Sequence, residues 1–377
     1  MPPSTVPSLV THLLNVTDPR DGPALLHPLV NIIAIAICGV ICGADGWTEI
    51  EEFGQAKYDW LKRFLDLARG IPSHDTFGRV FGRLDAQQFE EVFVSWVQAV
   101  AEKTQGQVIA IDGKTVRRSH DQSLGKKAIH MVSAWASANR LVLGQVKVDE
   151  KSNEITAIPA LLRLLDLSGC IVTIDAMGCQ KEIAAQVVGQ GGDYVLAVKD
   201  NQPQLGQKME KLFVQSRIPY SDLPADDVKR TEKDHGRLET RYCQALDVRE
   251  WLFYLDTERQ WAGLRSIVRV TARRRIRGEL SEETRYFISS LPCDAPRLLQ
   301  VIRDHWGVEN GLHWVLDVAF QEDASRIRKD NAAENFSRLR RLALNLLRNE
   351  KTAKVGTKAK RHMAGWSERY LLKVLSV

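Results

Sequence analysis

The chain has 377 residues, and 52 Lys and Arg against 47 Asp and Glu leave a formal net charge of +5. With 44% hydrophobic and 26% charged residues it has the composition of ordinary globular domains, about two to three of them, which excludes a fibrous repeat and an extensively disordered chain. Six cysteines without a C-x-x-C pair exclude a zinc ribbon and argue against a disulfide-stapled secreted domain. The first residues lack the segments of a signal peptide, so we expect a cytoplasmic protein.

Residues 1–103 predict an N-terminal α-helical domain. Its most apolar stretch, Leu29–Ala44, is 16 uncharged residues long, just short of a membrane span, and predicts a buried helix. Three further helices are expected to begin at polar cap residues, Thr48, Ser73 and Asp85, and the last two to cover 74–84 and 86–102. No alternating pattern typical of strands occurs in this part of the chain.

From residue 104 to 218 the pattern changes to short apolar runs separated by helical periods. The expected elements are strands at 108–111, 131–137, 141–148, 170–174 and 194–198, and helices at 154–166, 180–190 and 203–216. Three adjacent strands followed by alternating helices and strands predict an α/β fold, a mixed sheet flanked by helices. Helical periodicity returns at 292–350, in helices 295–320 and 331–349, which we assign to the same domain.

Residues 219–291 interrupt this domain as a β-rich insertion. Its expected strands are 241–246, 251–255, 266–271 and 284–290, joined by Arg-rich connections. Residues 351–377 are expected to form a basic C-terminal tail with a short amphipathic piece at 367–375. Because 326–361 holds twelve Lys or Arg against three Asp or Glu, we expect a basic surface there for a polyanionic partner.

Two aspartates follow apolar strands, Asp112 after Val-Ile-Ala-Ile and Asp175 after Ile-Val-Thr-Ile. Ligands of α/β sheets are usually bound at the carboxyl ends of strands, where carboxylates can hold a hard cation such as Mg²⁺. The alternative is that each aspartate merely caps a turn.

A third group of polar side chains lies on the helix 301–320, at four-residue spacing and so on one winding face: His305, Glu309, His313 and Asp317. Trp306 and Trp314 flank this face, and an indole is seldom left in open water. Together they indicate the wall of a cleft. The alternative is a solvated helix face supported by i,i+4 pairs.

Six blocks of the sequence closely resemble the H-repeat-associated insertion-sequence transposases, bacterial DDE transposases with a ribonuclease-H-like catalytic domain. The blocks are VIAIDGKTVRRS (108–119), AIHMVSAWAS…LVLGQVKVDEKSNEITAIP (128–159), IVTIDAMGCQKEIA (171–184), DYVLAVKDNQ (193–202), HGRLETR (235–241) and HWGVENGLHWVLDVAFQEDASRIRKDNA (305–332). The resemblance extends from about Leu25 to the C-terminus, with block order and spacing preserved.

The resemblance implies that Asp112, Asp175 and Glu309 are the catalytic, metal-binding acids, 63 and 134 residues apart. It implies two Mg²⁺ ions per active site, with Mn²⁺ as a substitute, acting as endonuclease and strand transferase on element ends and target DNA. The expected partners are the terminal inverted repeats, target DNA and a second copy of the chain, with no membrane, and the expected place is the nucleoid.

The chain departs from the pattern of the broader clan around Glu309. That clan usually carries Tyr and Arg seven and four residues before the Glu, and Lys seven after it, where this chain has Ile302, His305 and Leu316. Arg303 and His313 are candidates to replace those side chains in part. The roles of the non-acidic residues on this helix therefore stay open.

DNA contacts are expected from basic and aromatic residues near the acids, in the insertion and after the helix. These are Lys114, Arg117, Arg118, His235, Arg237, Arg241, Arg303, His305, Trp306, His313, Arg326, Arg328 and Lys329. Lys358, Lys360 and Arg361 are expected to add sequence-independent phosphate contacts. For the insertion the alternative is a solvated hairpin edge, and for Trp306 a packed core indole.

Two other functions stay open. One is a zinc hydrolase built on His305, Glu309 and His313, although their spacing is not H-E-x-x-H. The other is a non-catalytic DNA-binding remnant of an insertion element that keeps only basic surfaces.

Overall fold

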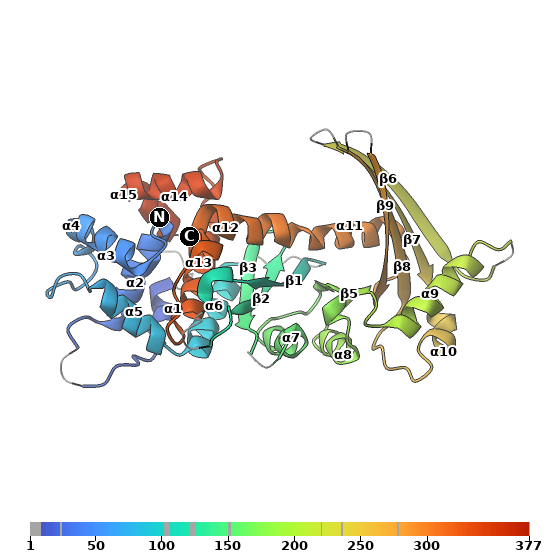
Figure 1. Cartoon of the computed structure of the whole chain (residues 1–377), viewed down its shortest axis with the longest axis horizontal. Helices are drawn as coiled ribbons and strands as arrows, with labels where there is room; N and C mark the ends of the chain where they lie inside the picture. The colour runs from blue at the N-terminus through green and yellow to red at the C-terminus, as the bar shows by residue number, and fades with distance from the viewer. Residues whose placement is uncertain are drawn as a thin grey trace, which may run out of the picture.

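The computed structural model describes residues 9–22, 25–101, 106–120, 125–149, 152–219, 221–234, 237–276 and 279–376. The strands of these segments form one nine-stranded mixed sheet in the order β3-β2-β1-β4-β5-β9-β8-β7-β6. Helices cover both of its faces, and further helices gather at one end of an elongated molecule (Figure 1). The predicted α/β class with a mixed, helix-covered sheet is confirmed.

The first five strands of the chain, β1 to β5, form one side of the sheet and run close to their predicted positions. They are β1 (Val108–Thr115), β2 (His130–Ala136), β3 (Leu141–Lys147), β4 (Ile171–Ile174) and β5 (Asp193–Val198). β2 pairs antiparallel with β1 and with β3, whereas β1, β4 and β5 are parallel. Alternate β1 side chains face opposite layers: Ile109 and Ile111 pack in the apolar cluster of α7 (Glu154–Arg163) and α8 (Lys181–Gly189), and Val108 packs in that of α11 (Ala295–His305).

The insertion extends the same sheet. Its strands are β6 (Ala225–Asp234), β7 (Arg237–Asp247), β8 (Ser266–Ile276) and β9 (Glu279–Ser289), all antiparallel to their neighbours, and β9 pairs with β5. α9 (Pro203–Gln215) precedes them. Two details differ from the sequence expectation. The predicted strand 251–255 is the short helix α10 (Leu252–Leu255) after a 3-10 turn, and β6 was not predicted, because its charged sequence shows no apolar alternation.

The N-terminal part is helical, as predicted. Its helices are α1 (Leu9–Leu13), α2 (Leu29–Ile41), α3 (Trp47–Ala56), α4 (Tyr58–Leu61), α5 (His74–Arg83) and α6 (Ala86–Val100). Ser73 and Asp85 cap α5 and α6 as expected, but α3 begins after Gly46 and Thr48 makes no cap. α2 is buried almost all round, and in the described part of the chain no helix has the length and apolarity to cross a bilayer.

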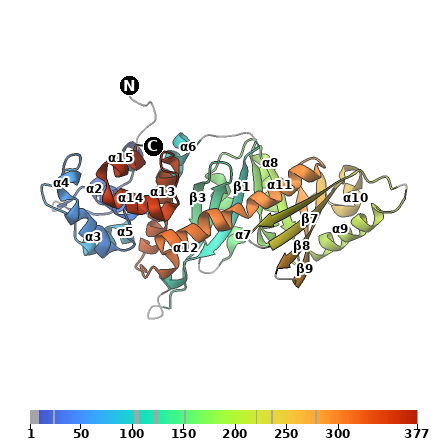
Figure 2. The ribbon, with the colours of Figure 1, turned by 90° about the horizontal axis from the view of Figure 1, so that it is seen from above.

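The predicted helix 295–320 is a continuous rod with a change of geometry in its middle. α11 is followed by a π-helical turn at Glu309–His313 and then by α12 (Trp314–Phe320). Seen from above, the rod crosses from the insertion strands to the N-terminal helices (Figure 2). π-turns inside helices are frequent at functional sites.

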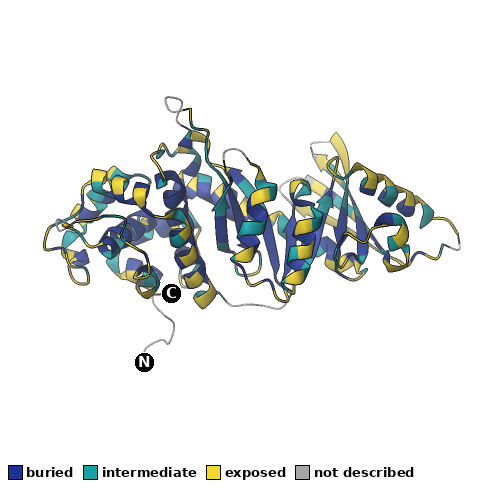
Figure 3. Ribbon diagram, turned by 90° about the horizontal axis from the view of Figure 1, so that it is seen from below, coloured by how far each residue is buried: buried dark blue, intermediate teal, exposed yellow. Residues whose placement is uncertain are grey.

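The last helices pack with the first ones. They are α13 (Ala332–Asn349), α14 (Thr357–Trp366) and α15 (Glu368–Leu375), and they share one hydrophobic cluster with α2, α5 and α6. The segment 351–377, expected as a basic tail, is therefore largely two docked helices. Seen from below, the helical end of the molecule has dark, buried segments in its interior and yellow, exposed segments at its outside (Figure 3).

Candidate active site

Two aspartates lie at the same edge of the central sheet. The parallel register pairs Ile111 of β1 with Ile174 of β4, so Asp112 and Asp175 come next on adjacent strands. One oxygen of Asp112 accepts the backbone N–H of Gly113 at 2.9 Å. Asp175 does cap a turn, since its Oδ1 accepts from the N–H groups of the next 3-10 turn at 3.1 and 3.4 Å. Asp112 lies inside β1, which continues to Thr115, and Asp175 directly follows β4, so both carboxylates are held where the parallel pairing of the two strands ends.

The π-helical turn brings the third acid to this edge. His313 Nδ1 lies 3.2 Å from Glu309 Oε2 and 3.6 Å from Asp112 Oδ2. One ligand atom from each of these three residues falls within 4.8 Å of the others. Gly311 permits the approach, because a Cβ there would lie 2.6 Å from the Trp135 ring of β2. The structure thus brings Asp112 and Glu309 together from distant parts of the chain.

Negative charges are in excess at this edge of the sheet. Burial, and then the nearby charges of Asp175, Glu154 and Glu309, raise the pKa of Asp112 to about 7. Burial also raises the pKa of Asp175, and burial lowers that of His313. Among the described residues no lysine or arginine forms an ion pair with the three acids. Carboxylates held together without a cation are the donor set of a hard divalent ion.

A fourth carboxylate belongs to this neighbourhood and was missed by sequence reasoning. Glu154 is the first residue of α7, and its Oε1 lies 2.6 Å from Nε2 of His130, whose Nδ1 is 2.8 Å from Thr115 Oγ1. Gly113 leaves room for this pair, since any Cβ there would collide with both side chains. The sequence does show an acid, Glu154, at the start of the helix after the third strand. On sequence grounds this position indicates only the beginning of the helix.

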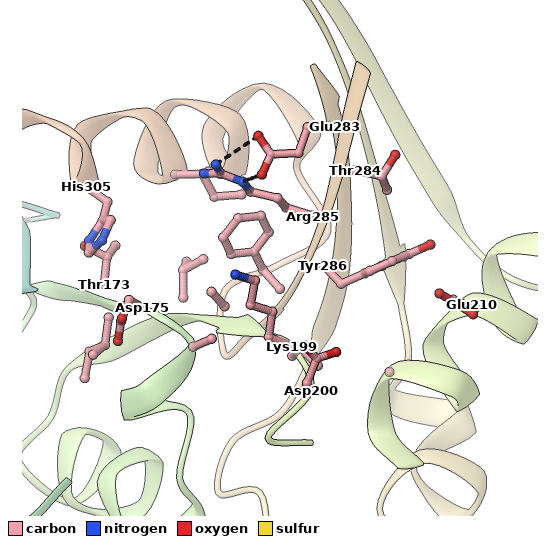
Figure 4. A pocket seen from close by; sticks show the side chains of 18 of the residues that line it. Thr173, Asp175, Lys199, Asp200, Glu210, Glu283, Thr284, Arg285, Tyr286 and His305 are labelled. Atoms are coloured by element: carbon pink, nitrogen blue, oxygen red, sulfur yellow. Dashed lines mark hydrogen bonds and ion pairs between the residues drawn. The ribbon is translucent and has the colours of Figure 1, made fainter. Parts of the chain in front are cut away.

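A cavity of about 600 Å³ opens beside Asp175, between β4, β5, β9 and α11. Figure 4 shows Asp175 and Lys199 on its floor, His305 above them and Arg285 paired with Glu283 on the opposite wall. His305 Nδ1 lies 3.0 Å from Thr173 Oγ1. Burial, helped by the charge of Arg285, lowers the pKa of His305 to about 4, so this imidazole is neutral at pH 7.

Trp306 stands at the rim of this cavity rather than in the core. Half of its surface is exposed, and the Arg285 guanidinium lies over its ring at 4.7 Å from the centroid. An exposed indole stacked by an arginine offers a flat surface beside the acids. The packed-core alternative for Trp306 does not describe this geometry.

The cations expected to follow Asp112 divide into two kinds. Lys114 is buried, with its Nζ 2.9 Å from Asp317 Oδ2 and 3.0 Å from Asp323 Oδ1. Arg117 pairs with the same Asp323 at 3.1 Å, whereas Arg118 is exposed. A phosphate contact by Lys114 would require its two carboxylate partners to be displaced, so its place in the fold is structural.

The expected DNA-binding residues further along the chain also differ in whether they are paired with acids or exposed. Glu232 of the insertion lies between Arg241 at 3.0 Å and Arg303 of α11 at 2.7 Å, and Arg241 also pairs with Glu239 at 2.8 Å, so both arginines are engaged in ion pairs. Arg326 and Lys329 are exposed, and Arg328 donates to the carbonyl of Arg118 at 3.2 Å. His235 lies outside the described residues, as does the side chain of Arg237.

Only part of the basic run 326–361 forms the basic surface that its composition predicted, since Arg326, Lys329, Lys351, Lys354 and Lys358 are exposed. Five of its cations are buried: Arg338, Arg340, Arg341, Lys360 and Arg361. Arg338 pairs with Glu90 at 2.6 Å and with Glu334 at 2.7 Å, and Arg341 pairs with Glu322 at 2.7 Å. Lys360 and Arg361 donate to backbone carbonyls of Leu347 and Val40. These cations hold helices together, and the expected phosphate contacts of Lys360 and Arg361 are wrong.

The zinc-hydrolase alternative loses its ligand set. The candidate cation site found in the described residues joins Asp112, Glu309 and His313, and does not include His305, which bonds Thr173 instead. One imidazole with carboxylates is a poor match to a zinc hydrolase, whose ligands include at least two histidine or cysteine side chains.

The comparisons with known proteins agree on one family. Residues 103–346 match the family model "Transposase DDE domain", and residues 10–97 match the model "DDE_Tnp_1-associated". The chain is 44% identical over 375 residues to "Putative transposase YncI" of Escherichia coli O157:H7, covering 99% of this chain and 95% of that protein. It is 42% identical over 372 residues to "H repeat-associated putative transposase YhhI" of E. coli K12, covering 98% and 97%.

Among solved structures, the chain is similar to a piggyBac transposase in a synaptic complex with hairpin DNA. The TM-score is 0.47 and the sequence identity 11%, over 96% of this chain and 75% of that one.

Proposed function

The chain belongs to the family of transposases with a DDE domain, and from this premise we propose that it cuts DNA at the ends of an insertion element and joins the freed 3′ end to target DNA. Asp112, Asp175 and Glu309 are the catalytic acids of this proposal. The observation that supports the proposal is that His313 lies within 3.6 Å of both Glu309 and Asp112. Asp175 follows the neighbouring strand β4 at the same edge of the sheet.

The donor set fits divalent cations. The three carboxylates are oxygen ligands that form no ion pair with a lysine or arginine among the described residues, and an incoming positive charge would offset the burial and the repulsion that raise the pKa of Asp112. Two Mg²⁺ ions, with Mn²⁺ as a substitute, would activate the attacking hydroxyl and stabilise the leaving oxygen at phosphorus. No nucleophilic serine or cysteine is needed for such a displacement.

The chain's own residues hold this site in shape. β1 and the turn after β4 hold Asp112 and Asp175, and His313 lies between the carboxylates of Glu309 and Asp112, at 3.2 and 3.6 Å. Lys199, whose charge lowers the pKa of Asp175, lies in the adjacent cavity where it can hold a phosphate next to the acids. Neutral His305 can donate or accept a single hydrogen bond there without repelling Lys199.

DNA contacts are proposed for the exposed cations of two segments that meet beyond β1. Arg118 joins Arg328 by a hydrogen bond, and Arg326 and Lys329 are exposed on the same segment as Arg328. These residues would bind phosphates and position the duplex, with affinity that falls as salt rises. The protein acts as a homodimer that holds two element ends.

The second candidate is a non-catalytic DNA-binding remnant. It would keep the exposed cations but needs no cluster of unpaired acids, and such a cluster costs stability without a cation to offset it. We therefore prefer the enzyme.

The test uses the full chain, DNA carrying the element's own ends, and Mg²⁺ or Mn²⁺, with strand breaks mapped to the nucleotide. Breaks at the element ends are expected from the wild type and not from Asp112→Asn, Asp175→Asn or Glu309→Gln, although all three still bind DNA. Glu182→Gln, an exposed carboxylate on α8, is the matched control and keeps cleavage. Cleavage by Glu309→Gln would refute the proposed acids, and DNA binding without cleavage by the wild type would favour the remnant.

A further inference from the structure

A second cavity, of about 430 Å³, lies between α12, α13 and the start of α14. Its cationic lining residues are Arg140, Arg348, Lys351, Lys358 and Lys360, and no acidic residue lines it. Its floor is apolar, with Val315, Ala319 and Leu347. A concave surface with apolar residues and five cations in its lining is suited to an anion with a flat, apolar part.

The cations of this cavity are crowded, although Lys360 pairs with Glu350 at 3.4 Å and Arg348 donates to the carbonyls of Arg140 and Gly311. Burial, followed by the charge of Arg140, lowers the pKa of Arg348 to about 9. Burial and then the charges of Lys360 and Arg348 lower the pKa of Lys351. The neighbouring acid Glu350 is turned inward, where its Oε2 accepts from the Tyr370 hydroxyl at 2.8 Å. Like charges held this close favour an anionic ligand, since its binding relieves their repulsion.

An exposed indole completes the cavity. Trp314 lines it and is 58% exposed, a large apolar surface left open beside three exposed cations, Arg140, Lys351 and Lys358. Aromatic faces next to lysine and arginine are the usual platform for unpaired bases. The uncapped start of α14, after Gly356, adds backbone N–H groups on the same side.

The cavity adjoins the candidate active site through one helix. Asn310 and Trp314, which line it, directly follow Glu309 and His313 in the chain, so the two sites lie on neighbouring faces of the same rod. A DNA strand that reaches Glu309 therefore has this cavity next to its path.

We propose that this cavity binds single-stranded DNA, with phosphates held by Arg140, Lys351 and Lys358 and one unpaired base stacked on Trp314. A single strand is favoured because the cavity is too small for a duplex and the indole can stack only on a base that has left its helix. The inference deepens the proposed function, on which it rests, by assigning a place to the strand beside the cut.

The experiment measures fluorescence anisotropy of a labelled ten-nucleotide oligothymidine with the full chain, in EDTA, over a range of salt. Lys351→Glu/Lys358→Glu is expected to weaken binding at least about tenfold and to flatten the salt slope by about 1.4, the value for two single-strand phosphate contacts. Trp314→Ala is expected to weaken it about tenfold with an unchanged slope. Because all three side chains are exposed, the thermal melting of each variant should match the wild type.

The matched control is Arg63→Glu/Arg163→Glu, which makes the same change of net charge at two exposed arginines outside the cavity. Oligothymidine affinity unchanged in the cavity variants, or reduced equally in the control, would overturn the proposal. Because binding is measured without metal, this result is independent of cleavage. A wild type that binds the oligonucleotide through the cavity but never cuts would leave this inference standing while the proposed catalysis fails.

Discussion

Two regions of the molecule bury carboxylates, and they treat them in opposite ways. Under α13, Glu322 lies fully buried with Arg341 at 2.7 Å, and although burial alone acts to raise its pKa, Arg341 and Arg340 bring it below the usual value. At the sheet edge, Asp112 is less enclosed, with 27% of its side chain exposed, but it faces other carboxylates, and burial and their charges raise its pKa to about 7. In the first region the carboxylate forms an ion pair that holds helices together. In the second the carboxylates have no arginine or lysine partner among the described residues and are available to a ligand.

This difference teaches how to separate structural from functional charge. Burial is common to both regions, so burial alone does not identify a site. What distinguishes the sheet edge is that, within the described residues, no arginine or lysine pairs with its three acids. Removing one charge is therefore expected to stabilise the protein at the sheet edge and to destabilise it under α13.

The largest expected effect is on cleavage. Asp112→Asn removes a carboxylate from the proposed site, and cleavage is expected to fall by about 10³-fold or more. The same change should stabilise the metal-free protein by up to about 4 kcal/mol at pH 8, because it deletes a half-buried charge whose pKa is raised from 3.8 to about 7. The raised pKa makes this gain appear as pH rises from about 4 to about 7 and vanish below pH 4. Urea unfolding at pH 4 and pH 8 in EDTA tests the sign, and a loss of stability at pH 8 would contradict it.

The next effect comes from breaking the buried pair. Arg341→Met leaves Glu322 enclosed without its guanidinium partner, and the free energy of unfolding is expected to fall by about 3–5 kcal/mol. Adding Glu322→Met should restore most of the loss, since two apolar side chains can replace a buried ion pair. Equal stability of the single variant and the wild type in urea would show that this region is not held by its charges.

A smaller effect, on metal affinity, is expected from Glu154, whose charge acts on both aspartates. Glu154→Gln keeps the size of the side chain but removes the charge that faces both aspartates, and metal affinity is expected to fall about tenfold. Cleavage should recover at higher Mn²⁺ concentration, which a loss of folding would not allow. Glu182→Gln should leave the metal titration unchanged.

The smallest effect is the response of stability to metal. Mg²⁺ or Mn²⁺ at about 10 to 100 times its dissociation constant is expected to stabilise the wild type by about 1–3 kcal/mol. Asp112→Asn/Glu309→Gln should lose this response, and Arg341→Met should keep it on a lower baseline. Calorimetric melting with and without metal measures all three, and an equal response in the double variant would place the ions elsewhere.

The sequence predicted those parts of the fold that depend on local patterns. Short apolar runs predicted strands β1 to β5. The caps Ser73 and Asp85 were predicted because a cap is a local hydrogen bond. The strand at 251–255 was wrong because a five-residue apolar piece does not distinguish a strand from a helical turn. β6 was missed because its neighbours in the sheet, rather than its own pattern, make it a strand.

The sequence also pointed to Asp112, Asp175 and Glu309, through strand ends, helix spacing and family resemblance. It failed wherever a partner comes from far along the chain. Arg338 was counted among surface cations because nothing local indicates Glu90, which neutralises it. Glu154 was passed over because only the folded sheet edge brings it near the aspartates.

The helical rod has a consequence for incomplete copies of this chain. α11 is anchored by Val301 and Ile302 among the insertion strands, and α12 by Leu316 and Phe320 among the N- and C-terminal helices. Glu309 sits between these anchors, so its placement depends on both outer parts of the molecule. A gene fragment that encodes the aspartate-bearing strands alone would therefore produce a protein with two of the acids and no means of assembling the third.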